Sequence, residues 1–235
     1  MKLLLVFLFS AVTSSLTAQT VINDKNVEVR DVSSFSGIKV SGGVDVYLSQ
    51  SDDYALAVSA SEEKYRDEIK TEIRNGILNI SFGNSALKFS GDKKLRVYIS
   101  FKTLESIEGS GACNLLFNDT FKAGDVRCKL SGACEIKGSI NIENLQLSLS
   151  GASTAKVTGR VTNLKIDASG ASDFKNYELV VENCKADISG ASDVRLTINR
   201  SVAARASGAS SLYYRGNPDR KDVNVSGASN VSPRN

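Results

Sequence analysis

The sequence predicts an all-β protein, a right-handed parallel β-helix (β-solenoid) with coils of about 19 residues. The tripeptide Ser-Gly-Ala recurs at a nearly constant interval through the C-terminal half of the chain. The residues before each copy alternate between apolar and polar, which is the period of a strand with one buried face. One such unit is too short to close a core, so neighbouring copies are expected to stack. The copies begin at Ser110, Ser131, Ser150, Ser169, Ser189, Ser207 and Ser226.

A short strand is predicted before each copy of the tripeptide. Apolar residues stand one, three and five positions before the Ser, as Leu149, Leu147 and Leu145 do before Ser150. In the last copy, Lys221 breaks the outermost of these positions. The polar residues between the apolar ones are expected to face outward.

The tripeptide itself predicts a tight corner. Gly permits the positive φ of a sharp bend, and we expect the Ala of each copy to point inward. A second apolar site follows three residues after the Ala, as at Ile136 and Phe174, and a further strand-like run leads to the next copy. The hexapeptide period typical of left-handed solenoids is absent, which favours a right-handed coil. A β-sandwich is the alternative, but it does not explain why the tripeptide recurs once per coil.

The mature chain is interpreted as one domain. Residues 1–18 resemble a signal peptide, with a basic residue, a short apolar run and small residues in order. Residues 19–33 form a polar lead or an edge strand, and residues 34–235 form the solenoid. Its coils are longer and irregular over 34–108, and regular over 109–232. The apolar run is too short to span a bilayer, so we expect no transmembrane segment and an exported protein of the periplasm, outer-membrane surface or medium.

Several elements are expected within the irregular half. Strands are predicted over 54–58 and 95–101, and a short helix over 61–70 with Ser61 as its cap. The dipeptide Asn75-Gly76 is typical of a tight hairpin, although it also suits a turn between two solenoid faces. We expect all these segments to belong to the same stack as the regular coils.

Four cysteines are expected to meet an oxidising compartment after export. Cys113 and Cys134 occupy the same position in consecutive copies, so one coil step brings them within disulfide reach. The alternative is that all four cysteines are free. Cys128 and Cys184 lie three coils apart, beyond disulfide reach, and are expected to be buried thiols that pack as small apolar residues. The cysteine spacing does not match a metal site.

Carboxylates recur at equivalent outward positions. Asp173 and Asp193 are expected to stack on adjacent coils, as are Asp167 and Asp187, and Glu135 takes the Asp173 position two coils earlier. Stacked carboxylates could hold calcium or act as a glycosidase pair. A solvated, charge-neutralised face is favoured, because basic residues flank both pairs. These are Lys165, Lys175, Lys185 and Arg195.

Tyr213 and Tyr214 form the candidate aromatic contact. We expect them on a loop over 213–219 that protrudes from the last coil, where aromatic faces suit a sugar ring or a protein partner. Burial over the open end of the stack is the alternative. The Ser hydroxyls of the tripeptides could likewise present a glycan surface, but hydrogen bonds to the backbone at each corner are favoured.

Three stretches resemble a known bacterial family. They are the run from Phe35 through Ile38, Val40 and Ser41-Gly42-Gly43-Val44-Asp45-Val46, the turn Asn75-Gly76-x-Leu78-x-Ile80, and the serial Ser-Gly-Ala copies. Together they resemble the "putative auto-transporter adhesin, head GIN domain" family, common in Bacteroidetes, over about residues 34–232. The resemblance implies an exported β-helical protein and brings no catalytic residues with it.

These features favour a binding or structural role over catalysis. The chain has no histidine, which excludes Ser–His and Cys–His catalysis, and we expect neither a cofactor nor a metal. A net charge of +3 implies no nucleic-acid partner. We expect a non-catalytic adhesin or envelope protein that binds a glycan or another envelope protein. The alternatives are a carbohydrate-active enzyme using Asp173 and Asp193, and a scaffold that forms homo-oligomers through its solenoid ends.

Overall fold

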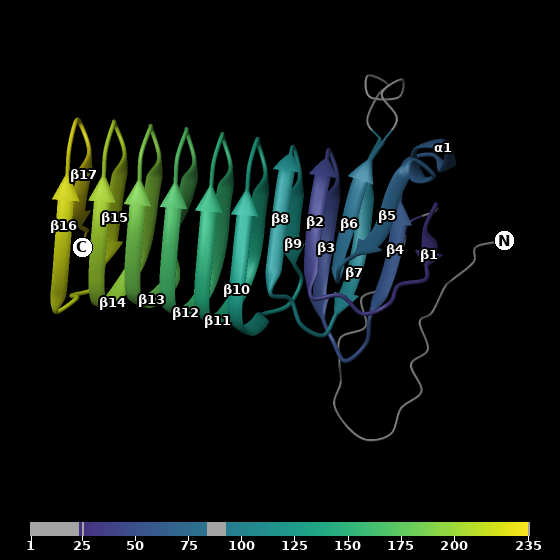
Figure 1. The fold of residues 1–235 in the computed structure, drawn as a ribbon, viewed down its shortest axis with the longest axis horizontal. Coiled ribbons are helices and arrows are strands. Elements are labelled where there is room, and N and C mark those ends of the chain that lie inside the picture. The colour runs from purple at the N-terminus through teal and green to yellow at the C-terminus, as the bar shows by residue number, and fades with distance from the viewer. Residues whose placement is uncertain (1–23, 25, 84–92, 235) are drawn as a thin grey trace.

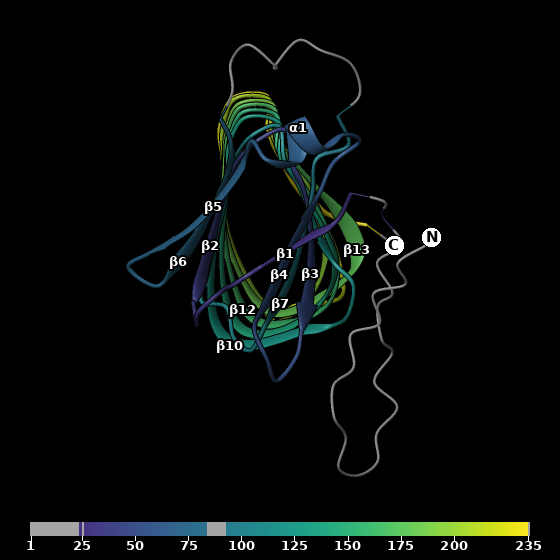
Figure 2. The ribbon, with the colours of Figure 1, turned by 90° about the vertical axis from the view of Figure 1, so that its right-hand side faces the viewer.

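The computed structural model describes residues 24, 26–83 and 93–234, which form one elongated stack of strands (Figure 1). All the described strands belong to one 17-stranded sheet that winds around a common axis (Figure 2). In Figure 1 the chain climbs on the near side, crosses over the top and steps toward the C-terminal end with each coil, so the winding is right-handed. The predicted β-solenoid is therefore confirmed. The signal peptide expected over 1–18 lies outside the described residues.

The regular coils are built from parallel strands that pair only with their equivalents on adjacent coils. Five long strands form the middle of the stack, and shorter strands make up the coils on either side. The long strands are β10 (Phe121–Leu130), β11 (Glu135–Leu149), β12 (Thr154–Ala168), β13 (Asp173–Ile188) and β14 (Asp193–Ala206). The shorter ones are β8 (Ser106–Gly111), β9 (Asn114–Phe117), β15 (Ser211–Arg215), β16 (Arg220–Val225) and β17 (Asn230–Pro233).

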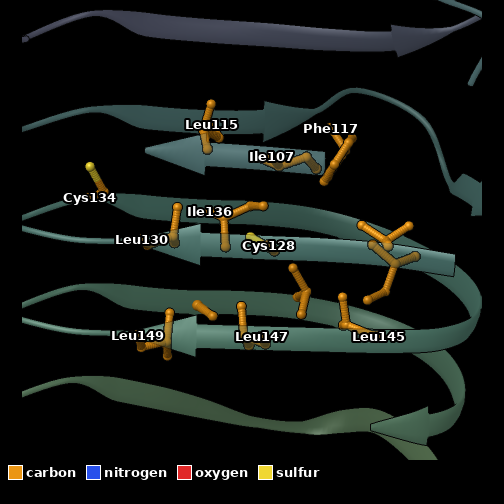
Figure 3. Packing of buried hydrophobic residues seen from close by; sticks show 14 of the residues in the cluster. Ile107, Leu115, Phe117, Cys128, Leu130, Cys134, Ile136, Leu145, Leu147 and Leu149 are labelled. Carbon is orange, nitrogen blue, oxygen red and sulfur yellow. The ribbon is translucent and has the colours of Figure 1, made fainter. Parts of the chain in front are cut away.

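The core consists of columns of apolar side chains that repeat from coil to coil. Leu130 pairs with Leu149, and Leu149 pairs with Ala168, all of them buried (Figure 3). The predicted inward positions before the tripeptide are thus confirmed along the middle coils. Burial fails only in the last copy, where Val223 and Val225 are 40% and 46% exposed. They lie on β16, the final strand that the structure describes on that face of the stack.

The corners depart from the sequence expectation in one respect. The Ala of each tripeptide is exposed, and in every copy but the last the buried side chain is the Cys or Ser that follows it. The preceding Gly takes a left-handed conformation, as Gly151 does with φ of 72°, which turns both Gly and Ala outward before the chain re-enters the core. Ser153 then donates a hydrogen bond of 2.8 Å from its buried hydroxyl to the Ser150 carbonyl, closing the corner.

The N-terminal half is not wound in sequence order. Strands β2 (Gly37–Gly42) and β3 (Asp45–Gln50) form a coil that pairs in parallel with β8 and β9 on one side. On its other side this coil pairs with β6 (Ile77–Phe82) and β7 (Arg96–Phe101). The first coil therefore lies between two later segments, which simple stacking of irregular coils did not predict.

Antiparallel strands end the stack beyond β6 and β7. Strand β5 (Ile69–Arg74) pairs with β6, β4 (Ala55–Ser59) pairs with β7, and β1 (Glu28–Arg30) pairs with β4 as an edge strand. Asn75 and Gly76 have positive φ angles of 52° and 74° and connect β5 to β6 (Figure 2). This confirms that the dipeptide forms a tight hairpin and not a turn between two solenoid faces. The predicted helix is one turn, α1 (Glu63–Arg66), whose cap position is Glu62 and not Ser61.

Candidate ligand groove on the outer face

The predicted carboxylate pairs do stack, but basic side chains neutralise them. Asp173 and Asp193 are register partners on adjacent coils. Lys175 Nζ lies 3.0 Å from Asp173 Oδ2 and 3.9 Å from Asp193 Oδ2, and Arg195 lies 2.8 Å from the latter. The arrangement leaves neither carboxylate without a countercharge, as the solvated-face interpretation expects.

Of the other outward carboxylates, Glu135 and Asp167 are paired with lysines, whereas Asp187 has no cation within 4.0 Å among the described residues. Glu135 contacts Lys137 at 2.7 Å and Lys156 at 2.5 Å. Burial raises the pKa of Glu135, but the two ammonium groups outweigh it and hold that pKa below its ordinary value. Asp167 lies 3.2 Å from Lys165. The described part of the chain contains no cluster of three or more groups that could hold a metal ion.

The two tyrosines lie in a strand, so the expected protruding loop is wrong at their positions. Both belong to β15, where Tyr213 pairs with Arg195 and Tyr214 pairs with Leu196 on β14. Tyr214 is buried in the core. Tyr213 is half-buried, and the Arg234 guanidinium lies 4.4 Å from its ring centroid. Of the two tyrosines, only Tyr213 therefore presents its ring outward at this end of the stack.

The four cysteines are all buried, and none of them is disulfide-bonded in the structure. Cys113 and Cys134 lie on adjacent coils with hydrogen-bonded sulfurs. This hydrogen bond lowers the pKa of Cys134 and raises that of Cys113, so the first thiolate forms on Cys134. Burial raises the pKa of Cys128 and of Cys184 to about 12, as expected for thiols that pack as apolar groups.

Three of the tripeptide hydroxyls, those of Ser110, Ser131 and Ser150, donate to backbone carbonyls of the adjacent coil. Ser131 donates to the Gly109 carbonyl at 3.3 Å, and Ser150 donates to the Leu130 carbonyl at 3.4 Å on the preceding coil. These contacts follow the backbone interpretation of the Ser column. A second hydroxyl column, which includes Ser153, is buried and holds the corners.

A groove of about 930 Å³ runs along the outside of the stack, and the repeat alone did not predict it. It crosses all five long strands, β10 to β14, so at a coil spacing of about 4.8 Å it extends for roughly 19 Å. Two columns of outward side chains line it. The first column consists of Asp125, Asn144, Asn163, Asn183 and Ser201, and we call the hollow the ladder groove after it. The second column consists of Arg127, Gln146, Lys165, Lys185 and Ala203.

The first column forms a continuous hydrogen-bonded chain, the asparagine ladder. Asn144 donates to Asp125 Oδ1 at 2.8 Å, and Asn163 donates to Asn144 Oδ1 at 2.8 Å. Asn183 then donates to Asn163 Oδ1 at 3.0 Å, and the Ser201 hydroxyl donates to Asn183 Oδ1 at 2.8 Å. The ladder fixes the amide orientations, because each carbonyl accepts from one side and each amide donates to the other.

A sequence signal for the ladder exists. Every member stands six positions before the Ser of its tripeptide, as Asn144 does before Ser150 and Asn163 before Ser169. The strand pattern hides it, because this position falls just beyond the outermost apolar site. Glu143 and Asn144 both face outward between the buried Ile142 and Leu145, so strict alternation is lost there.

A family model described as "Putative auto-transporter adhesin, head GIN domain" matches residues 34–218. The chain belongs to this family. The match covers the irregular coils and all five coils that carry the ladder groove, so in this head GIN protein the groove lies within the family domain. The resemblance of the opening strands and the serial tripeptides is thereby confirmed. No curated protein matches the sequence.

Solved structures share the fold of this head GIN protein. A putative adhesin from Bacteroides fragilis is 20% identical with a TM-score of 0.79, covering 90% of this chain and 98% of that one. A putative adhesin from Parabacteroides distasonis is 18% identical with a TM-score of 0.66, covering 90% and 98%. A protein of the same species described as a putative lipid binding protein is 20% identical with a TM-score of 0.66, covering 88% and 97%. None of the helices that the structure describes is long and apolar enough to cross a membrane.

Proposed function

We propose that this head GIN protein is a non-catalytic, adhesin-like binding protein, exported to the cell surface, that holds an elongated glycan in the ladder groove. The observation that carries the proposal is the asparagine ladder, which places an identical amide on three successive coils. A polymer lying along the stack meets the same group at every step. The description of the family and of the related structures as adhesins agrees with this role.

The chemistry of the ladder suits hydroxyl groups. An Asn amide has two N–H donors, and the ladder uses one of them within each pair. The second N–H and one carbonyl lone pair per Asn are left for a ligand. Sugar hydroxyls both donate and accept, so they can complement such a row. A binding role is also supported by the ion pairs of Asp173 and Asp193, because they neutralise the two carboxylates that were the candidates for glycoside hydrolysis.

The test measures binding and turnover together. Purified protein is titrated with a panel of linear polysaccharides, and released reducing ends are assayed in the same samples. Asn163→Leu should weaken binding at least about tenfold, because it removes the central rung. Asn141→Leu, at an exposed position outside the groove, is the matched control. Binding unchanged by Asn163→Leu, or hydrolysis that depends on Asp173 and Asp193, would contradict the proposal.

A second candidate function is self-assembly through the end of the stack. It is favoured by the exposed β16, where Val223 and Val225 present apolar side chains beside an unpaired strand edge. Light scattering should then report a mass that rises with protein concentration. The double substitution Val223→Lys with Val225→Lys should return the protein to a monomer, whereas a constant monomer mass in the unmodified protein rules assembly out.

A further inference from the structure

We infer that the ladder groove is built for an acidic, carboxylate-bearing polysaccharide. This inference rests on the proposed function and names the class of glycan. Its basis is the second column of the groove, which carries cations beside the asparagine ladder. A ligand that spans the groove meets amides along one side and positive charge along the other.

The charge of the groove is positive, and most of it is unpaired. Four cations line it against two carboxylates, Glu105 and Asp125, a net charge of +2. Lys165 is paired with Asp167, 3.2 Å away. The other three cations have no carboxylate within 4.0 Å in the described part of the chain; they are Lys122, Arg127 and Lys185.

The placement of these cations matches a polymer with regularly placed charges. Arg127, Lys165 and Lys185 occupy one column on β10, β12 and β13. The separations are two coils and one coil, or about 10 Å and about 5 Å at the spacing of a parallel sheet. Both lining carboxylates lie near the β10 end of the groove, so toward the opposite end the lining carries Lys165, which is paired with Asp167, and the unpaired Lys185. The planar guanidinium of Arg127 suits a bidentate contact with a carboxylate.

The lining argues against a nucleic acid as the occupant. Among the described residues that line the groove, none is Phe or Tyr, so no platform exists on which bases could stack. Single-stranded nucleic acids are held mainly by such stacking together with phosphate contacts. The amides of the ladder instead favour a ligand that carries hydroxyls as well as charge. An acidic polysaccharide combines both.

The experiment compares four probes with the full chain: polygalacturonate, dextran sulfate, dextran and double-stranded DNA. Titration calorimetry should detect binding of polygalacturonate at low ionic strength, and raising the salt concentration to about 0.5 M should weaken this binding. The double variant Arg127→Gln with Lys185→Gln should lose about tenfold in affinity for polygalacturonate. The control Lys129→Gln with Arg205→Gln removes two exposed cations of the same face outside the groove, and should stay within about twofold of the unmodified protein.

The outcomes separate this inference from the proposed function. Dextran bound as tightly as polygalacturonate, with no effect of the charge variant, overturns the inference while the glycan groove stands. No binding of any polysaccharide overturns both. Equal losses in the two double variants, or DNA bound more tightly than polygalacturonate, also overturn the inference, because they indicate attraction to a general positive surface. Dextran sulfate bound more tightly than polygalacturonate overturns the choice of carboxylate.

Discussion

Asn183 donates a hydrogen bond of 3.0 Å to Asn163 on the preceding coil, and Asn163 passes the same interaction on to Asn144 at 2.8 Å. Each amide is therefore both donor and acceptor in one chain, and the order of the ladder depends on every member. Such a chain stabilises the stack as well as shaping the groove.

Asn163→Asp should destabilise the protein by about 1 kcal/mol. The new carboxylate accepts from Asn183 but cannot donate to Asn144, so it places two oxygens against each other. The midpoint of urea unfolding measures the change. Asn141→Asp, which introduces the same charge at an exposed position outside the ladder, should lie close to the unmodified protein. Equal midpoints for the two variants would show that the ladder adds nothing to stability.

Gly170→Ala should be far more damaging than Gly124→Ala. A Cβ at Gly170 falls 2.6 Å from the Gly151 carbonyl oxygen of the adjacent coil, and its φ of 75° already disfavours a side chain. The conformational part alone is about 1–2 kcal/mol. At Gly124 a Cβ meets nothing within 4 Å. The melting temperature and the resistance to proteolysis should both fall for Gly170→Ala only. Equal melting temperatures would refute the close stacking of corners.

Cys113 and Cys134 should form a disulfide when the protein is purified from an oxidising compartment. Their sulfurs are in hydrogen-bond contact, and the lowered pKa of Cys134 supplies the thiolate that exchange requires. Thiol titration after denaturation should then count two free thiols, Cys128 and Cys184. Reduction should lower stability by about 3 kcal/mol for a loop of this length. Four titratable thiols in the oxidised protein would contradict the bridge.

Acid should remove the contribution of Glu135 to stability. Its pKa in the folded protein is below the ordinary 4.5, so folding favours the charged form. The stabilisation is present above about pH 4.5 and is lost as the pH falls through the folded pKa. Glu135→Gln should therefore lower stability at pH 7, by no more than about 1 kcal/mol, and the difference should vanish near pH 2. A difference that persists in acid would mean that the ion pairs with Lys137 and Lys156 are not its source.

The sequence was sufficient for the winding because the information repeats. Leu130 and Leu149 each stand one place before a tripeptide, and the same place is buried on the next coils. The corner was misjudged, because the small Ala152 was expected to point inward at a tight bend, whereas the left-handed Gly151 turns it out and sends Ser153 inward. The direction of a side chain at a corner depends on backbone angles, which the small size of the residue does not reveal.

The ladder groove could not be predicted from the sequence pattern either, because its shape depends on how the coils stack in space. Asn144 and Asn163 share an offset from their tripeptides, but only coordinates place them side by side with Arg127 and Lys165 across a hollow. The placement of β2 and β3 between later strands was equally hidden, because it depends on long-range pairing with no local signal. The ion pairs of Asp173 and Asp193, by contrast, followed from the basic residues two positions along each strand.

The nearly constant register from β10 to β14 makes the length of this molecule adjustable by gene duplication. Copying one Ser-Gly-Ala segment would add a rung to the asparagine ladder and leave every existing contact in place except at the new junction. Under the proposed function, relatives with more or fewer such segments would bind longer or shorter stretches of polymer. The number of segments would then set the avidity, while the chemistry of each segment is preserved.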